Sequence, residues 1–224
     1  MTNETAESKA GEVPPRSAPF ERFAGVCAVL TCVAGFLYAV AFIVLQNNLL
    51  SGLFLMLSGL LTSAALVAVY GRLRETEATF ALFALLLGTA GALGSTVHGG
   101  YDLANALNPS PSIPDPNLPN PVDPRGLLTF GVAGAALFVV AWLIVRGGQF
   151  PRGLGYLGYV SAILLVVLYL GRLIVLNPTN PVILAPALLN GFLINPVFYL
   201  WLGLVLLRGR SMQSRERFLR GHAG

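Results

Sequence analysis

The sequence predicts an all-α membrane protein, a polytopic bundle of six transmembrane helices. Of its 224 residues, 55% are hydrophobic and only 11% are charged, whereas soluble domains carry roughly 25% charged residues. The chain holds six apolar stretches, each close to the about 20 residues that a helix needs to cross the hydrocarbon core. The charged residues gather before, between and after these stretches, as in a protein that crosses the membrane several times.

Each predicted span is bounded by polar or charged residues. A polar segment, residues 1–22, precedes the first span, and we expect it to be a disordered cytoplasmic tail rather than a signal peptide. The third span stays apolar to Val97 and then continues as a more polar helix. A basic cytoplasmic tail, residues 208–224, follows the last span. The six spans cover about residues 23–45, 50–70, 78–107, 126–145, 154–176 and 182–207.

Positive charge marks one side of this bundle. Arginines follow span two, separate spans four and five, and follow span six, whereas the opposite connections hold only Arg125. Because short cytoplasmic loops carry an excess of Lys and Arg, we expect both termini in the cytoplasm and the protein in the inner (plasma) membrane of a bacterium. The same arginines account for the net charge of +4, so the expected partner is the lipid bilayer and not a nucleic acid.

The connection between spans three and four is rich in proline. Seven of the eighteen residues in 108–125 are Pro, which excludes a helix and favours a stiff, extended outer loop. Two interpretations stay open for this loop, a rigid spacer and a lid over an outward-facing pocket.

Three ionisable residues lie at membrane depth, where such side chains are costly and face a bundle interior or a cavity. His98 and Asp102 are four residues apart and share one face of span three. Arg172 lies about one turn from the outer end of span five. The predicted depths of Asp102 and Arg172 agree, so we expect Arg172 to pair with Asp102 and His98 to lie one turn deeper. The pair is either a structural lock or part of an outward-facing polar site.

Span six adds polar groups to the same half of the membrane. Asn190 lies in its outer half, and Asn195 and Pro196 lie near its middle. Proline removes a backbone donor, so we expect a helix break at this pair. Broken helices line binding sites in several transporters.

Several chemistries lack the residues that they need. His98 and His222 are the only histidines of the chain, so a metal site of several His and Cys ligands cannot be assembled within the membrane. No phosphate-binding loop or nucleophile elbow is present. Ser95, His98 and Asp102 share one helix, where attack geometry is difficult to reach. We therefore predict no catalytic residues, no metal and no cofactor.

Two segments in the second half of the chain, within about residues 125–210, are LFVVAWLIVRGGQFPRGLGYLGYVSAILLVV and NPVFYLWLGLVLLRGR. On these segments rests a resemblance to a family of bacterial multi-pass membrane proteins grouped only as a domain of unknown function. It includes a Pro-Arg-x-Leu-Gly turn at Pro151 and a W-L-G-x-x-L-x-R ending from Trp201 to Arg208. It implies an uncharacterised six-helix protein and brings no catalytic residues with it.

Two functional hypotheses follow. In the first, an outward-facing pocket lined by His98, Asp102, Arg172 and Asn190 binds or moves a small polar solute or a lipid headgroup. In the alternative, the protein is a structural or partner-binding subunit, as a homo-oligomer or with another membrane protein, and the same residues only hold the bundle together. An intramembrane enzyme is the hypothesis that the residues support least.

Overall fold

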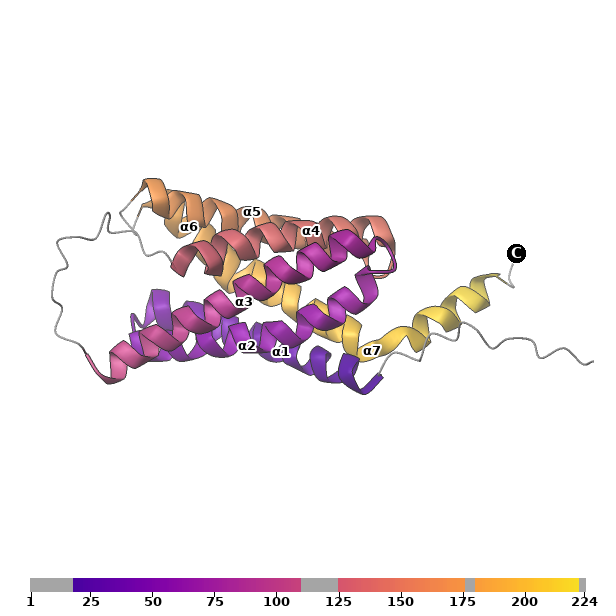
Figure 1. Ribbon diagram of the computed structural model, residues 1–224, viewed down its shortest axis with the longest axis horizontal. Coiled ribbons are helices and arrows are strands. Elements are labelled where there is room, and N and C mark those ends of the chain that lie inside the picture. Colours follow the sequence, from indigo (N-terminus) through magenta and orange to yellow (C-terminus); the bar gives the residue numbers. More distant parts are fainter. Residues whose placement is uncertain (1–17, 110–124, 176–179, 222–224) are drawn as a thin grey trace, which may run out of the picture.

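The computed structural model is a bundle of helices and confirms the predicted fold class (Figure 1). The structure describes residues 18–109, 125–175 and 180–221, and the following statements concern these residues. They contain no strand and form six helical segments long and apolar enough to cross a membrane. The predicted tail 1–22 and the proline-rich loop 108–125 lie mostly outside the described residues.

Three of the six spans contain a π-helical segment. Span one begins at Ala18, ahead of the predicted start at residue 23. The third span, which we expected to continue as a polar helix, runs without a break to Leu107. The spans are α1 (Ala18–Ala39) with η1 (Val40–Val44), α2 (Asn48–Leu73), α3 (Ala78–Leu107), η2 (Leu127–Val132) with α4 (Ala133–Gly147), α5 (Arg152–Ile174), and α6 (Pro181–Leu189) with η3 (Asn190–Ile194) and α7 (Asn195–Gly221).

The helix ends carry the local signals that set them. The Asn47 side chain accepts a hydrogen bond from the Leu50 amide, and the Asn180 side chain accepts one from the Val182 amide, so asparagine caps the start of α2 and of α6. Gly148 ends α4 with φ of 67°, a left-handed conformation that glycine adopts without strain. Pro151 then precedes the first turn of α5.

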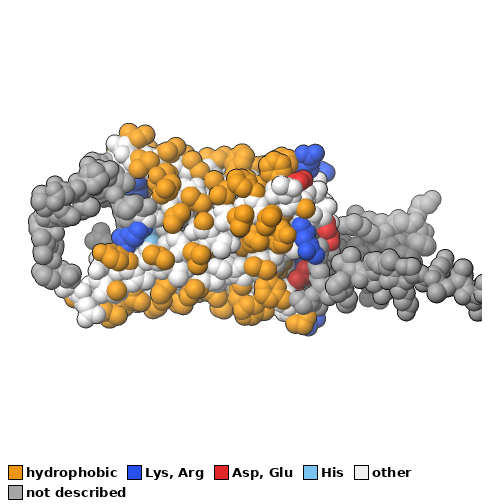
Figure 2. All heavy atoms as spheres, in the orientation of Figure 1, with side chains coloured by type: hydrophobic (Ala, Val, Ile, Leu, Met, Phe, Trp, Pro, Cys, Tyr) orange, Lys and Arg blue, Asp and Glu red, His pale blue; other side chains and the backbone are white. Residues whose placement is uncertain are grey.

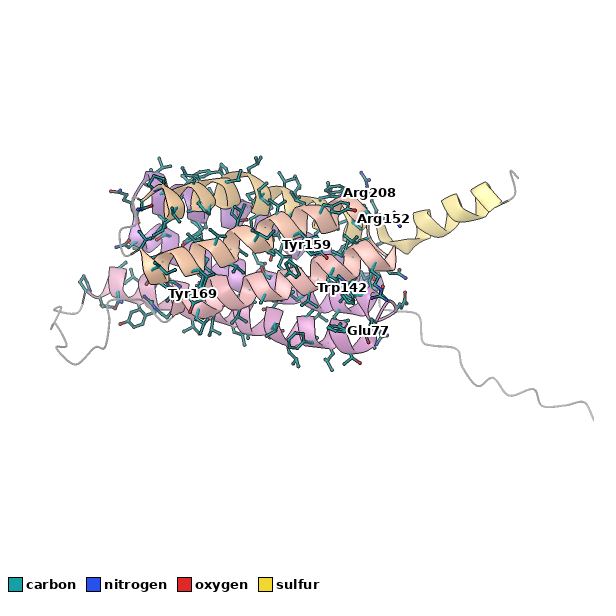
Figure 3. The ribbon with its side chains drawn as sticks, turned by 90° about the horizontal axis from the view of Figure 1, so that it is seen from above. Glu77, Trp142, Arg152, Tyr159, Tyr169 and Arg208 are labelled. Atoms are coloured by element: carbon teal, nitrogen blue, oxygen red, sulfur yellow. The ribbon has the colours of Figure 1, made fainter. Side chains whose placement is uncertain are left out.

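The two ends of the bundle differ in charge, and an apolar belt separates them (Figure 2). We call one the Arg72 end; it holds the connections 74–77 and 148–151. Glu77, Arg152 and Arg208 lie there (Figure 3). The other is the Asp102 end, where the connection 45–47 lies, α3 ends at Leu107, η2 begins at Leu127 and α5 ends at Ile174. Large apolar side chains are exposed between the two ends, among them Leu86 at 62% and Val97 at 64%. Such a surface is stable in lipid, which establishes an integral membrane protein.

The spans form a ring in sequence order. Each of α1 to α5 packs against the next span, and α7 packs back onto α1. In Figure 1, α1 and α2 lie together along one side, α4 to α6 lie along the other, and α3 crosses obliquely between them.

Glycines bring neighbouring backbones into contact in this ring. A Cβ atom at Gly59 of α2 would lie 2.5 Å from the Ala92 carbonyl oxygen of α3, and one at Gly99 would lie 2.5 Å from the Gly52 carbonyl oxygen. Between α1 and α7, a Cβ at Gly203 would lie 2.8 Å from the Gly25 carbonyl oxygen. Small residues in span three therefore permit close packing against span two.

A buried ion pair and an apolar cluster close the Arg72 end. The Arg72 side chain is 1% exposed, and its guanidinium donates two hydrogen bonds to Glu21 of α1, at 3.3 Å and 3.1 Å. Its Cζ lies 5.3 Å from the centre of the Phe150 ring. Leu73, Leu154 and Leu206 are buried in the same cluster. Breaking such a pair would leave an uncompensated charge in the interior, so the pair ties α1 and α2 firmly together.

The glycine contacts give a direct prediction for stability. Gly99→Ala places a methyl group against the backbone of α2 and should cost about 1–3 kcal/mol, which lowers Tm by about 3–10 °C in a protein of this size. Gly71→Ala is the matched control, because nothing lies within 4 Å of a Cβ at this position of α2. Thermal unfolding in one mild detergent compares the two variants, and an equal Tm for both would contradict the packing described.

Candidate functional site

A central cavity of about 240 Å³ lies inside the ring of spans. All six spans line it, and most of the lining is apolar, including Leu66, Leu137 and Leu165. A cavity of roughly 150 Å³ with apolar walls is already large enough to bind a benzene-sized molecule. The polar side chains of the lining are those of Tyr38, Ser58, Thr62, Ser95, Thr129, Arg172, Asn190, Asn195 and Tyr199.

The three π-helical segments all contribute to the cavity wall. Phe42 comes from η1, Phe130 from η2, and Asn190 and Gly191 from η3. A π-helical turn inserts one residue into the helix and is often found at functional sites. The departures from regular α-helix in this bundle thus surround one cavity.

The cavity runs along the axis of the bundle. Towards the Arg72 end it stops at Val69, Ile144 and Leu202, next to the cluster that contains the Arg72–Glu21 pair. Towards the Asp102 end it reaches Phe42 and Arg172. It is therefore closed at one end and has its only charged lining side chain, among the residues described, near the other.

Arg172 lies in the last turn of α5, where its side chain is exposed. It makes no ion pair with any other residue that the structure describes. The Tyr38 hydroxyl of α1 lies within electrostatic reach of both Arg172 and Asp102. Arg172 and Asp102 therefore lie near the same end of the bundle.

Asn190 is buried and holds α5 and span six together. The Ser161 hydroxyl donates a hydrogen bond of 2.8 Å to the Asn190 side-chain oxygen, and Asn190 also lines the cavity. The helix break predicted at Asn195 and Pro196 is not seen, because span six is one continuous helix from Pro181 to Arg208, in which η3 passes directly into α7 at Asn195. The Asn195 side chain lines the cavity, and Pro196 is buried beside it.

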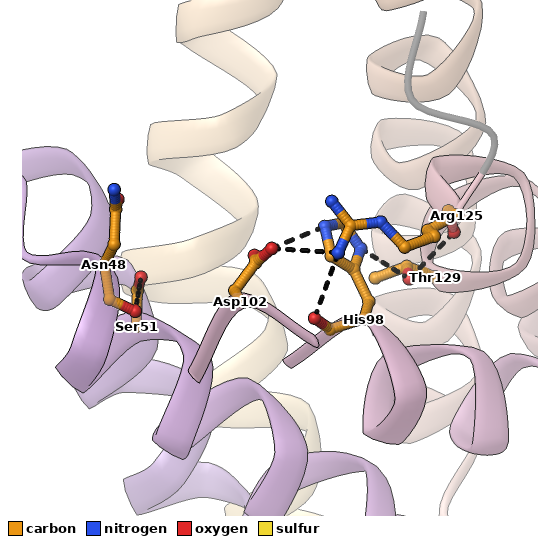
Figure 4. Close-up of polar contacts among 6 residues, drawn as sticks. All are labelled: Asn48, Ser51, His98, Asp102, Arg125 and Thr129. Carbon is orange, nitrogen blue, oxygen red and sulfur yellow. Dashed lines mark hydrogen bonds and ion pairs between the residues drawn. The ribbon is translucent and has the colours of Figure 1, made fainter. Parts of the chain in front are cut away.

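His98 and Asp102 belong to a separate cluster that joins α3 to the start of span four (Figure 4). The Arg125 guanidinium donates a hydrogen bond of 2.9 Å to the Asp102 carboxylate, and His98 Nε2 lies 3.6 Å from the other carboxylate oxygen. His98 Nδ1 lies 3.1 Å from the Thr129 hydroxyl, which donates to the Arg125 carbonyl oxygen. The Arg125 Cζ also lies 4.5 Å from the centre of the Tyr101 ring.

The prediction that Arg172 pairs with Asp102 is wrong. Arg125 is the partner, because the start of span four packs against α3, whereas α5 packs against α4, η2 and α6 and lies one position further along the ring. The four residues that we expected in one pocket are thus divided. Arg172 and Asn190 line the cavity, and His98 and Asp102 stand beside it.

Two functionally placed arginines were not identified from the sequence. Arg125 directly precedes span four and is the only positive residue in the connections on that side of the bundle, a position that already lies near the depth of Asp102. Arg72 was assigned to the cytoplasmic boundary as an orienting charge. No local pattern shows that Arg72 is buried, because its partner Glu21 lies 51 positions away in the chain.

No group of three or more His, Cys, Asp or Glu side chains lies close enough to hold a metal ion within the described ranges. Comparisons with protein-family models, with curated proteins and with solved structures find no match to this chain. They give no support to the resemblance to a bacterial six-helix family.

The cluster around Asp102 predicts which arginine is energetically coupled to it. In a double-mutant cycle, Asp102→Asn and Arg125→Gln should show a coupling energy of about 1 kcal/mol, since the pair is partly exposed. The cycle of Asp102→Asn with Arg172→Gln is the control and should give a coupling near zero. Unfolding free energies in one detergent supply both values, and the larger coupling in the Arg172 cycle would contradict the assignment.

Proposed function

We propose that the protein binds a membrane lipid, with an apolar chain of the lipid in the central cavity and its polar headgroup at the Asp102 end. The observation that carries this proposal is the cavity itself, about 240 Å³ in volume, lined by every span and closed at the Arg72 end. Its lining extends from Ile144 near the Arg72 end to Arg172 near the Asp102 end, and its charged side chain, among the residues described, lies at the Asp102 end only. This distribution of polarity matches an amphiphile.

The lining favours a lipid chain over a small polar solute. A polar solute loses its hydrogen bonds to water when it is buried, and each lost bond costs free energy unless the site replaces it. Several polar groups of the cavity are already used within the protein. Asn190 accepts a hydrogen bond from Ser161, and the hydroxyl of Thr62 donates one to Tyr199 at 3.5 Å. An apolar chain needs no such replacement and gains from leaving water.

The positive-inside rule supports an outward-facing headgroup site. Arg72, Arg74, Arg146, Arg152 and Arg208 flank the spans at the Arg72 end. With the Arg72 end on the cytoplasmic side of the inner membrane, the Asp102 end faces outward. The alternative, a structural or partner-binding subunit without a ligand site, fits the cluster of His98, Asp102 and Arg125 but gives no role to the cavity.

A change that fills the cavity tests this function. Ala136 lines the cavity and is 3% exposed, whereas the neighbouring Ala135 is exposed on the outside of α4. Lysophosphatidylglycerol at about 100 times its Kd should raise the Tm of the purified full-length protein by roughly 5–10 °C. Ala136→Phe should abolish this shift, and Ala135→Phe should preserve it.

A second cavity-lining variant, Ala65→Leu on α2, provides an independent test in case Ala136→Phe fails to fold. Both cavity variants should unfold cooperatively without added lipid. An equal lipid-induced shift in the wild type and in a cooperatively folded cavity variant would exclude the cavity as the binding site and leave the structural-subunit alternative.

A further inference from the structure

The ring of spans has one gap among the elements that the structure describes. At the Asp102 end, η1 packs against α2, η2 packs against α3 and α5, and α6 packs against α5. No comparable packing joins α6 to α1 or to η1. The ring is therefore closed in its Arg72 half and open between spans one and six in its Asp102 half.

The gap begins where the glycine contacts of spans one and six end. Going from the Arg72 end towards the Asp102 end, Gly25 of span one contacts Gly203 of span six, and Gly35 of span one then contacts Asn195 of span six. Their last close backbone approach is at Gly191, where a Cβ would lie 2.9 Å from the Ala39 Cβ. The π-helical segments η1 and η3 lie at this level. Between this level and the Asp102 end, α6 packs against α5 and not against span one.

The gap is continuous with the central cavity. Its two sides are formed by cavity-lining residues, Phe42 and Ile43 on η1 and Leu184 and Ala187 on α6. The Phe42 side chain lines the cavity and is still 45% exposed. An apolar chain lying in the surrounding lipid can therefore pass into the cavity without leaving an apolar environment.

The Arg172 guanidinium lies where the polar headgroup of a lipid in the cavity would be. It lies on the cavity wall at the open half of the ring, and no ion pair with another described residue occupies it. The nearest carboxylate of the polar cluster, that of Asp102, is held by Arg125. A guanidinium matches a phosphate oxygen pair with two parallel hydrogen bonds, so this position suits an anionic phosphate headgroup.

We propose that the ligand is an anionic phospholipid of the outer leaflet, that its chain enters sideways between η1 and α6, and that Arg172 binds its phosphate. This inference rests on the proposed lipid-binding function. It adds the chemical class of the headgroup and the route of entry.

The headgroup is tested with two arginine variants on the same helix. Arg172→Gln should weaken binding of lysophosphatidylglycerol by about tenfold, as expected for hydrogen bonds to a charged group. The affinity for a monoacylglycerol, which has an acyl chain but no phosphate, should change much less, and inorganic phosphate alone should not stabilise the wild type. Arg152→Gln is the control, since Arg152 is exposed at the opposite end of α5. A loss of equal size in both variants would overturn the role of Arg172.

The route of entry is tested by photolabelling in vesicles. A phosphatidylglycerol with a diazirine at the end of its chain is added to the outer leaflet, and samples are irradiated after increasing times. In the wild type, adducts should form deep in the cavity, on the segments around Val69 and Ile144. Ala187→Phe should eliminate these adducts at early times while leaving them after long incubation.

Ala185→Phe is the matched control for entry, because Ala185 is exposed on α6 and does not line the cavity. Unchanged early labelling in Ala187→Phe, or an equal loss in Ala185→Phe, would exclude entry through the gap while leaving the lipid site intact. Absence of deep adducts in the wild type at every time would instead overturn the proposed function itself.

Discussion

The contact between α1 and α7 determines the shape of the whole bundle. Gly25 and Gly203 face each other so closely that either Cβ would meet the other helix's backbone. This contact closes the ring of six spans at the Arg72 end, where the Arg72–Glu21 pair also joins α1 to α2. Helices in lipid gain little from the hydrophobic effect and associate mainly through such close packing. The contact ends at Gly191. The ring is therefore closed between this level and the Arg72 end, and open between this level and the Asp102 end.

The cavity is a consequence of this unequal packing. Small residues hold α2 against α3 and α1 against α7, whereas the π-helical segments in spans one, four and six shift side chains away from regular register. The space left at the centre is mostly apolar, with hydroxyl and amide groups along its length and its charged lining side chain, among the residues described, at the Asp102 end. There the two arginines have different surroundings. Arg125 is bound to Asp102 and secures α3 to span four, and Arg172 stands on the cavity wall.

The sequence is sufficient to predict the fold class, the number of spans and the half of the bundle that holds the polar residues. Each of these follows from hydropathy and from the position of charges along the chain. It is insufficient for the pairing of Asp102, since the choice between Arg125 and Arg172 depends on which helices are neighbours in the ring. The cavity is likewise invisible in the sequence. It depends on the depth in the bundle at which Gly191 and the three π-helical segments lie, and this depth cannot be predicted from the hydrophobic periodicity of the sequence.

The central claim is that an acyl chain occupies the cavity between the six spans. The most direct measurement is a crystal structure grown from a lipidic phase that contains a phosphatidylglycerol with a brominated chain. The account predicts an anomalous bromine peak inside the ring, between Leu66 of α2 and Leu165 of α5. Bromine peaks found only on the outer, lipid-facing surface, with an empty cavity, would contradict it.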